Sequence, residues 1–183
     1  SLAKAMRLAH VAHFGGQLRR LGVDETRPSR AALRYLSAEA ENLAEAWRHA
    51  CDLQDLAAQR LLAEALTLHH EFQARCMAGA ALLDGTADPR IALLRARLLH
   101  WAAPLQAEAI AEAAFVALVA SDDEPGLIAA ARVRGLVAWR RGAPALAVSR
   151  FREGLDRGRR SGLNSHRAIL LDGLGLALHD LGD

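Results

Sequence analysis

The sequence predicts an all-α protein, organised as an α-solenoid of antiparallel helix pairs in a tetratricopeptide-like, right-handed superhelix. Composition is the first reason: Ala and Leu, two strong helix formers, supply 72 of the 183 residues, whereas Val, Ile and Thr together supply only 14. Amphipathic helical patterns also follow one another with short breaks along the chain. Finally, parts of the sequence recur after 40 residues, the spacing of a solenoid built from helix pairs.

Nine helices are expected, each bounded by residues that start or stop helices. Proline at the first helical position opens several of them, as in Asp88-Pro89 and at Pro144. Gly85 and Gly142 stand where helices are expected to end. No break resembles a flexible linker, so residues 1–183 are interpreted as a single helical-repeat domain. The expected helices span residues 2–21, 29–50, 53–72, 74–83, 88–101, 104–120, 125–141, 143–160 and 164–181.

The 40-residue repeat is clearest in the last three expected helices. Gly135 is followed 40 residues later by Gly175, and small residues at this position allow close approach of a neighbouring helix. Ala147, Phe151 and Leu155 recur every four residues on the helix between them and share one face. We expect Phe151 to fill the space beside Gly135. One such pair cannot bury its second apolar face alone, so neighbouring pairs are expected to stack.

The last expected helix has no partner helix after it. Leu181-Gly182 corresponds, at the 40-residue offset, to the turn at Arg141-Gly142, after which a new helix begins. The chain is therefore interpreted as a fragment of a longer multidomain protein. The apolar face left open on the last helix is expected to support end-to-end homodimerisation of the fragment.

Several classes of function are disfavoured by what the sequence lacks. Lys4 is the single lysine and lies far from any glycine-rich loop, which excludes a P-loop phosphate site in this chain. No apolar run approaches the ~20 residues of a membrane span, and no signal peptide is visible, so no membrane partner is expected. Cys51 and Cys76 cannot form a disulfide framework and suit a reducing cytoplasm, which is the expected location.

Neither a metal site nor an enzyme active site is expected. His10 and His13 share a helix, and His69-His70 stand together, but the spacing of a structural zinc site is missing. No nucleophile elbow is present, and carboxylates are scattered. The sequence thus predicts a non-catalytic chain that holds no cofactor.

Arginines gather in one part of the chain. Residues 132–167 carry ten Arg against Glu153 and Asp156. Two interpretations stay open: a basic patch that binds nucleic acid or another anion, and solvated or internally docked side chains. Aromatic residues interleaved for single-stranded nucleic acid are missing. The candidate patch consists of Arg134, Arg141, Arg150, Arg157 and Arg160.

Trp101 and Trp139 fall near the ends of two expected helices. They could line a concave ligand groove, or they could pack at the core or its rim as isolated aromatics usually do. Both interpretations stay open at the level of the sequence.

One segment resembles a known family. The run from Leu36 to Ala50, with Glu39, Asn42, Leu43 and Trp47, resembles the Glu-x-x-Asn-Leu-x-x-Ala-Leu-x-Trp-Ala segment of large bacterial signal-transduction ATPases that regulate transcription. These include relatives of the maltose-regulon activator, LuxR-type ATPase regulators and antibiotic regulatory proteins. The run from Gly142 to Leu155 is similar to a repeat unit of the same family, although Ala143 replaces its usual Asp.

The resemblance implies a role for the chain within a larger regulator. It implies a non-catalytic sensor or protein-interaction array that follows an ATPase module and a winged helix. ATP would then bind elsewhere in the full protein, and DNA would be contacted by another domain. The implied partners are the protein's own ATPase and winged-helix module and a small-molecule effector or protein bound on the concave face, which would shift the ATPase between states.

The residues that carry the resemblance also allow a packing interpretation. Glu39, Asn42 and Trp47 would form a docking surface for the preceding domain in the first interpretation. In the second, Leu36, Ala40, Leu43 and Trp47 form one apolar stripe, and Asn42 bonds a neighbouring loop.

Overall fold

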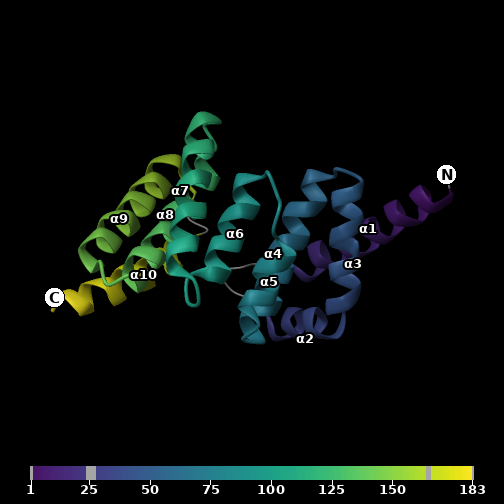
Figure 1. Cartoon of the computed structure of the whole chain (residues 1–183), viewed down its shortest axis with the longest axis horizontal. Helices are drawn as coiled ribbons and strands as arrows, with labels where there is room; N and C mark the ends of the chain where they lie inside the picture. Colours follow the sequence, from purple (N-terminus) through teal and green to yellow (C-terminus); the bar gives the residue numbers. More distant parts are fainter. Residues whose placement is uncertain (1, 24–27, 164–165, 183) are drawn as a thin grey trace. The chain divides into compact units, whose positions relative to one another are not determined.

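The computed structural model describes residues 2–23, 28–163 and 166–182, and every regular element in these residues is an α-helix. The predicted all-α class is therefore confirmed. The helices follow one another along the chain, and short turns separate most of them (Figure 1). Their bounds are α1 Leu2–Leu21, α2 Arg30–Ala38, α3 Ala40–Asp52, α4 Leu56–Phe72, α5 Cys76–Leu82, α6 Pro89–Leu99, α7 Pro104–Ala120, α8 Glu124–Arg140, α9 Pro144–Ser161 and α10 Arg167–Leu181.

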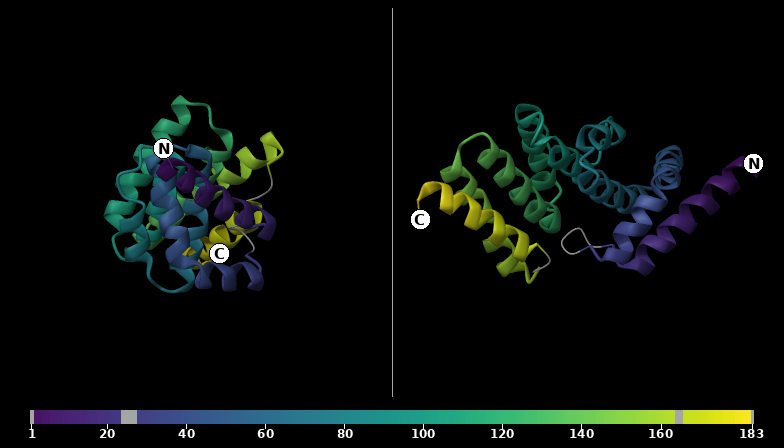
Figure 2. Two further views of the ribbon diagram at one scale, coloured as in Figure 1. Left: turned by 90° about the vertical axis from the view of Figure 1, so that its right-hand side faces the viewer. Right: turned by 90° about the horizontal axis from the view of Figure 1, so that it is seen from below.

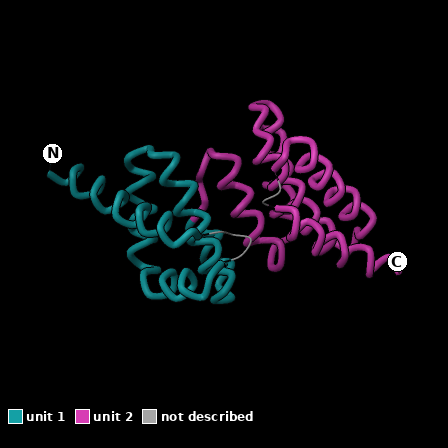
Figure 3. Tube along the Cα trace, turned by 180° about the vertical axis from the view of Figure 1, so that it is seen from behind, with its two compact units in different colours: residues 1–82 teal, residues 83–183 magenta. Residues whose placement is uncertain are grey.

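The chain divides into two compact units, Ser1–Leu82 and Leu83–Asp183 (Figure 3). Unit 1 holds α1 to α5 and unit 2 holds α6 to α10. The expectation of one continuous array over residues 1–183 stays a prediction. None of the described helices is both long and apolar enough to cross a lipid bilayer.

The expected helix over residues 29–50 is two helices, because the chain bends at Glu39. Glu39 has φ −106° and ψ 14°, outside the helical range. Its N–H still donates to the Tyr35 carbonyl at 2.9 Å, and its own carbonyl accepts from the Leu43 N–H at 2.8 Å. The bend thus keeps the backbone hydrogen-bonded and needs neither Gly nor Pro. The hydrophobic pattern of the sequence continues across residue 39, so the pattern does not reveal the bend.

Three helices end on a left-handed residue that is not glycine. Gln54, Ala74 and Asp122 have φ values of 55°, 53° and 51°. In each case the following N–H returns to a carbonyl five residues earlier, for example from Asp123 to Leu118 at 3.1 Å. This hydrogen bond closes the helix end in the way of a Schellman turn. Gly142 makes the same turn after α8, with φ 74°.

Unit 1 is built on α1, α3 and α4, whose apolar faces meet. Leu18, Leu43 and Leu62 are fully buried there, one from each helix. Trp47 lies on α3 and is also buried, and its Nε1–H donates to the Leu82 carbonyl at the end of α5, at 3.2 Å. This hydrogen bond links the end of α5 to the centre of the unit.

Unit 2 is a stack of antiparallel helices in which each packs against the next, and α8, α9 and α10 can be followed side by side in Figure 2. One aromatic ring, that of Phe151, packs in its core between two neighbouring helices. Phe151, on α9, is 1% exposed. A Cβ added at Gly135 of α8 or at Gly173 of α10 would lie 2.6 Å from a carbon of this ring. The Gly135–Phe151 contact is the one expected from the sequence, and Gly173 gives the ring its second wall.

Candidate functional site

The tryptophans of unit 2 meet at one edge. Trp101 follows α6, Trp139 lies in the last turn of α8, and their ring centroids are 6.4 Å apart at an interplanar angle of 89°. The 40-residue repeat explains why these two rings lie close together. Positions 100, 140 and 180 are equivalent at the 40-residue offset, and the ends of α6, α8 and α10 carry them. Side chains beside these positions are therefore brought to the same edge.

An arginine and an aspartate complete this group. The guanidinium carbon of Arg140 lies 3.4 Å from the centroid of the Trp101 ring and 5.7 Å from that of Trp139. Such cation–π contacts contribute about 0.5–1 kcal/mol at exposed sites. The indole N–H of Trp139 donates to Asp180 Oδ2 at 2.6 Å. We call the four residues Trp101, Trp139, Arg140 and Asp180 the aromatic ladder.

The aromatic ladder is open to solvent but held in place. Trp101 is 56% exposed, which is a large apolar exposure for a side chain of this size. Its orientation is nevertheless constrained by the arginine above it and by the edge of Trp139. The sequence singled out the two tryptophans. It gave no signal for Arg140 and Asp180 as their partners, because those contacts cross between helices.

The candidate arginine patch is largely paired with carboxylates. The side chain of Arg134 is only 4% exposed and donates through Nε and Nη2 to both carboxylate oxygens of Glu112, at 2.7 and 2.8 Å. Arg150 lies 3.8 Å from the same carboxylate. Arg134 also lies over the Phe115 ring, at 3.9 Å from its centroid. These contacts join α7 to α8 and α9.

Three more arginines of the patch are engaged. Arg157 donates to Glu124 at 2.9 Å, and Arg141 forms an ion pair with Glu108. Arg160 donates through Nε to a backbone carbonyl of its own helix at 3.3 Å. The two residues of each ion pair are 33 positions apart in the sequence and lie on different helices. Four of the five arginines of the candidate patch, all except Arg160, thus lie in ion pairs between helices.

The residues of the family-like segment divide into a buried and an exposed half. Leu43 and Trp47 are buried, as the packing interpretation expects. Asn42 is exposed, and its Nδ2 donates to Glu39 Oε2 at 2.7 Å. This hydrogen bond stays within one turn and does not reach a neighbouring loop, so the expected role of Asn42 in the packing interpretation is wrong. Ala147, from the repeat-like segment, is fully buried beside Phe151.

A polar groove runs along unit 1 between α3 and the segment that joins α4 to α5. Glu41, Arg75 and the buried His69 are among the residues that line it. His69 Nδ1 has no hydrogen-bond partner among the described residues. Burial, and secondarily the charge of Arg75, lower the pKa of His69 below its usual value. The imidazole is thus held neutral near pH 7.

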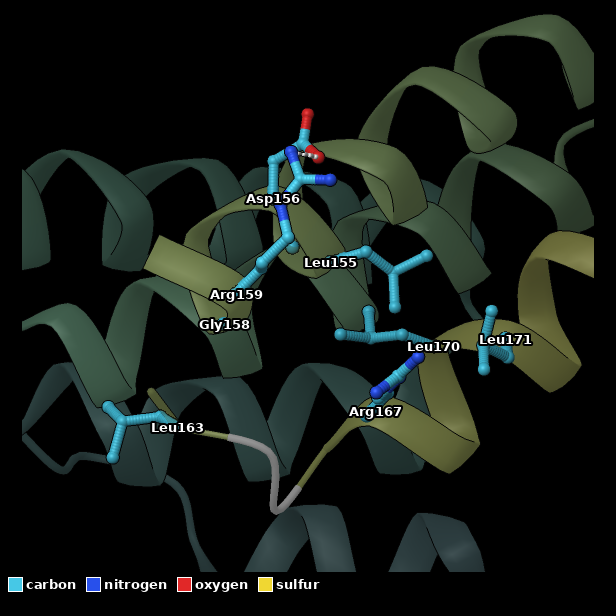
Figure 4. Close-up of a pocket in the computed structure, with 9 residues that line it drawn as sticks. Leu155, Asp156, Gly158, Arg159, Leu163, Arg167, Leu170 and Leu171 are labelled. Carbon is cyan, nitrogen blue, oxygen red and sulfur yellow. Dashed lines mark hydrogen bonds and ion pairs between the residues drawn. The ribbon is translucent and has the colours of Figure 1, made fainter. Parts of the chain in front are cut away.

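A smaller cavity lies between α9 and α10 in unit 2 (Figure 4). Leucines, among them Leu155 and Leu170, line it together with Arg159, which forms an ion pair with Asp156 at 3.0 Å. Its volume of about 210 Å³ is below the range of roughly 300–1,000 Å³ typical of small-molecule sites. It is therefore a weaker candidate than the groove of unit 1.

The histidines considered as metal ligands have other contacts. His10 Nδ1 lies 3.2 Å from His49 Nδ1, and His49 Nε2 lies 3.2 Å from a carboxylate oxygen of Glu45. His13 lies edge-on to the ring of Phe14. In the part of the chain that the structure describes, no group of three or more His, Cys, Asp or Glu side chains is placed to hold a metal ion.

The chain matches no family model, no curated protein and no solved structure.

Proposed function

We propose that the chain is a non-catalytic sensor and protein-interaction module of tetratricopeptide type, and that the aromatic ladder is the contact surface of unit 2. The observation that carries this proposal is the half-exposed Trp101 held under the guanidinium of Arg140. Tryptophan and arginine are the residues most enriched among those that dominate binding energy in protein interfaces.

The aromatic ladder suits a partner because it is organised before binding. Asp180 holds the indole of Trp139, and Arg140 covers Trp101, so few side-chain rotations are lost when a partner docks. Desolvation on docking would also strengthen the cation–π contact, to about 2 kcal/mol. A partner with an apolar surface and a carboxylate near Arg140 fits this chemistry best.

We further propose that this module belongs to a multidomain bacterial transcriptional regulator with an ATPase. Support comes from the resemblance of residues 36–50 and 142–155 to the arrays of that family. In such a protein, the partner or effector would act by preferring one state of the ATPase, since a ligand with equal affinity for both states shifts nothing. ATP and DNA would bind outside this chain. The free cysteines Cys51 and Cys76 support a cytoplasmic location.

Binding of nucleic acid by the arginine patch is the alternative, and the contacts favour it less. Arg134, Arg150 and Arg157 face carboxylates of neighbouring helices, so their charge is already compensated within unit 2. A phosphate backbone would have to compete with these carboxylates for the same guanidinium groups.

The first test reads the coding sequence on both sides of this chain. A glycine-rich P-loop with its lysine, followed by a winged helix, is the expected upstream content. Absence of an ATPase module from the same protein would overturn the regulator proposal.

The second test measures binding of the chain to that ATPase and winged-helix module. Trp101→Ala is expected to weaken binding at least tenfold, whereas Phe72→Ala, which removes a similarly exposed aromatic side chain from unit 1, is expected to leave it unchanged. Equal effects of the two substitutions would contradict the assignment of the contact surface.

A third measurement decides the nucleic-acid alternative. The exposed Arg152 and Arg167 form no ion pair among the described residues, so their reversal to Glu removes positive charge without breaking a described contact. Salt-dependent retention of DNA by the chain, lost with both substitutions, would favour the alternative. Reversal of Arg150 or Arg157 would also break ion pairs and is less informative.

A further inference from the structure

The groove of unit 1 has the size of a site for a small molecule. It consists of two adjoining parts with volumes of about 600 and 440 Å³, and small-molecule sites typically measure roughly 300–1,000 Å³. Glu41, His69 and Arg75 line both parts. The residues of the larger part come from α3, α4, α5 and the turn between α4 and α5. The groove therefore belongs to unit 1 alone.

Two imidazoles at this groove have no hydrogen-bond partner. His69 is only 8% exposed, and the Nδ1 atoms of His69 and His70 are buried without a partner among the described residues. Their Nε2 atoms form no described hydrogen bond either, but they are not enclosed. A proton on Nδ1 would be a buried donor without an acceptor, whereas a proton on Nε2 stays accessible. Both rings therefore present an N–H donor that a ligand can reach.

The two rings are held in place before any ligand binds. Their centroids are 5.2 Å apart at an interplanar angle of 71°. A Cβ at Gly79 of α5 would lie 2.8 Å from three carbons of the His70 side chain, so α5 packs closely against it. Burial is the main cause that lowers the pKa of His69 and of His70, and the charge of Arg75 contributes to both. The guanidinium is thus close to two neutral imidazoles.

One positive and one negative side chain of the groove are free to meet a ligand. Arg75 and Glu41 are exposed, and neither forms an ion pair among the described residues, so their charged groups do not neutralise each other. The other two charged side chains of the groove, Glu45 and Arg48, form an ion pair with each other. The free charges of the groove are therefore one guanidinium and one carboxylate, with space between them.

We propose that this groove binds an amino acid with an apolar side chain, with its carboxylate at Arg75 and its ammonium group at Glu41. The guanidinium and the imidazole N–H groups are all donors, and a carboxylate can accept from several of them. The ammonium group is a donor that suits the carboxylate of Glu41. This inference does not depend on the aromatic ladder or on the regulator proposal. The apolar side chain of the ligand would contact the apolar residues of the larger part, which are Ala40, Ala44, Ala78 and Leu82.

The test titrates the whole chain with L-leucine by isothermal titration calorimetry. We expect saturable binding with a Kd below about 1 mM. Two further probes each remove one charge from leucine: 4-methylpentanoate lacks the amino group, and 3-methylbutylamine lacks the carboxylate. Each is expected to bind at least tenfold more weakly, because one charged side chain of the groove then has no partner. Absence of leucine binding in this range, or equal binding of either probe, would overturn the proposal.

Three substitutions of exposed side chains assign the binding to the groove. Arg75→Gln is expected to weaken leucine binding at least tenfold. Arg34→Gln is the matched control, because Arg34 is an exposed arginine of α2 that forms no ion pair among the described residues and does not line the groove. Glu41→Gln is expected to abolish the preference for leucine over 4-methylpentanoate. Equal effects of the two arginine substitutions, or an unchanged preference in the Glu41→Gln chain, would contradict the assignment.

Discussion

Gly135→Ala tests the packing of unit 2 with a single methyl group. The added Cβ would lie 2.6 Å from Cε1 of Phe151 and 2.8 Å from Cδ1 and Cζ. Carbon atoms in contact prefer separations of about 3.5–4.0 Å, so the ring would have to move by about 1 Å. Gly173 closes the other side of the ring, where a Cβ would also lie 2.6 Å away. The ring therefore has little room to retreat.

The expected result is a net destabilisation of about 2 kcal/mol. Overpacking of a core costs about 1–3 kcal/mol, and the confined ring places this site at the upper end. The better helix propensity of alanine offsets about 1 kcal/mol of this loss in the free energy of unfolding. Gly175→Ala is the matched control, because it makes the same change at the equivalent position with no atom within 4 Å. We expect it to raise the free energy of unfolding by about 0.5–1 kcal/mol.

Urea unfolding followed by circular dichroism at 222 nm measures both changes. The two alanine substitutions should shift the midpoint in opposite directions. A further substitution, Phe151→Leu, should reduce the loss caused by Gly135→Ala, since a smaller side chain makes room for the methyl group. If Gly135→Ala stabilises the protein as much as Gly175→Ala does, the proposed contact between α8 and the Phe151 ring is wrong.

Three other predictions concern ion pairs, protonation and a single hydrogen bond. Glu112→Ala should lower the free energy of unfolding by about 2 kcal/mol, because it removes the bidentate partner of the buried Arg134, and urea midpoints will show this. Burial, then the charges of His49 and His13, lower the pKa of His10 below its model-peptide value of 6.5. The unfolded chain therefore binds more protons below that pH, so the melting temperature should fall between pH 7.5 and pH 5, and His10→Gln should reduce that dependence. Trp47→Phe should cost about 1 kcal/mol in urea unfolding, because it removes the hydrogen bond to the end of α5.

Most of the helices could be predicted because their ends carry strong local signals. The expected helix over 104–120 agrees with α7, Pro104–Ala120, since proline starts it. The left-handed residues Gln54, Ala74 and Asp122 carry no such signal, because none of them is the glycine that usually marks this turn. The bend at Glu39 carries none either, since its backbone hydrogen bonds are kept.

The candidate surface was predictable only in part, because its contacts join distant residues. Trp101 and Trp139 stand out as rare aromatic residues, and each can be noticed alone. Their convergence requires the register between α6 and α8, and the role of Asp180 requires the register of α10 as well. The arginine patch shows the same limit. Composition revealed its positive charge, but Glu112 and Glu124, which compensate part of it, lie outside residues 132–167.

The 40-residue repeat has two different consequences for the side chains of unit 2. The repeat places equivalent backbone positions at the same edge or face of successive helix pairs, and it leaves the side chains there free to differ. At the edge, positions 100, 140 and 180 carry His, Arg and Asp, and this difference makes a surface on which a cation, two indoles and a carboxylate meet. Positions 135 and 175 both carry glycine. The Phe151 ring packs against Gly135, whereas a Cβ at Gly175 would have no atom within 4 Å. Equivalent backbone positions in successive repeats therefore share a location but not a chemical environment.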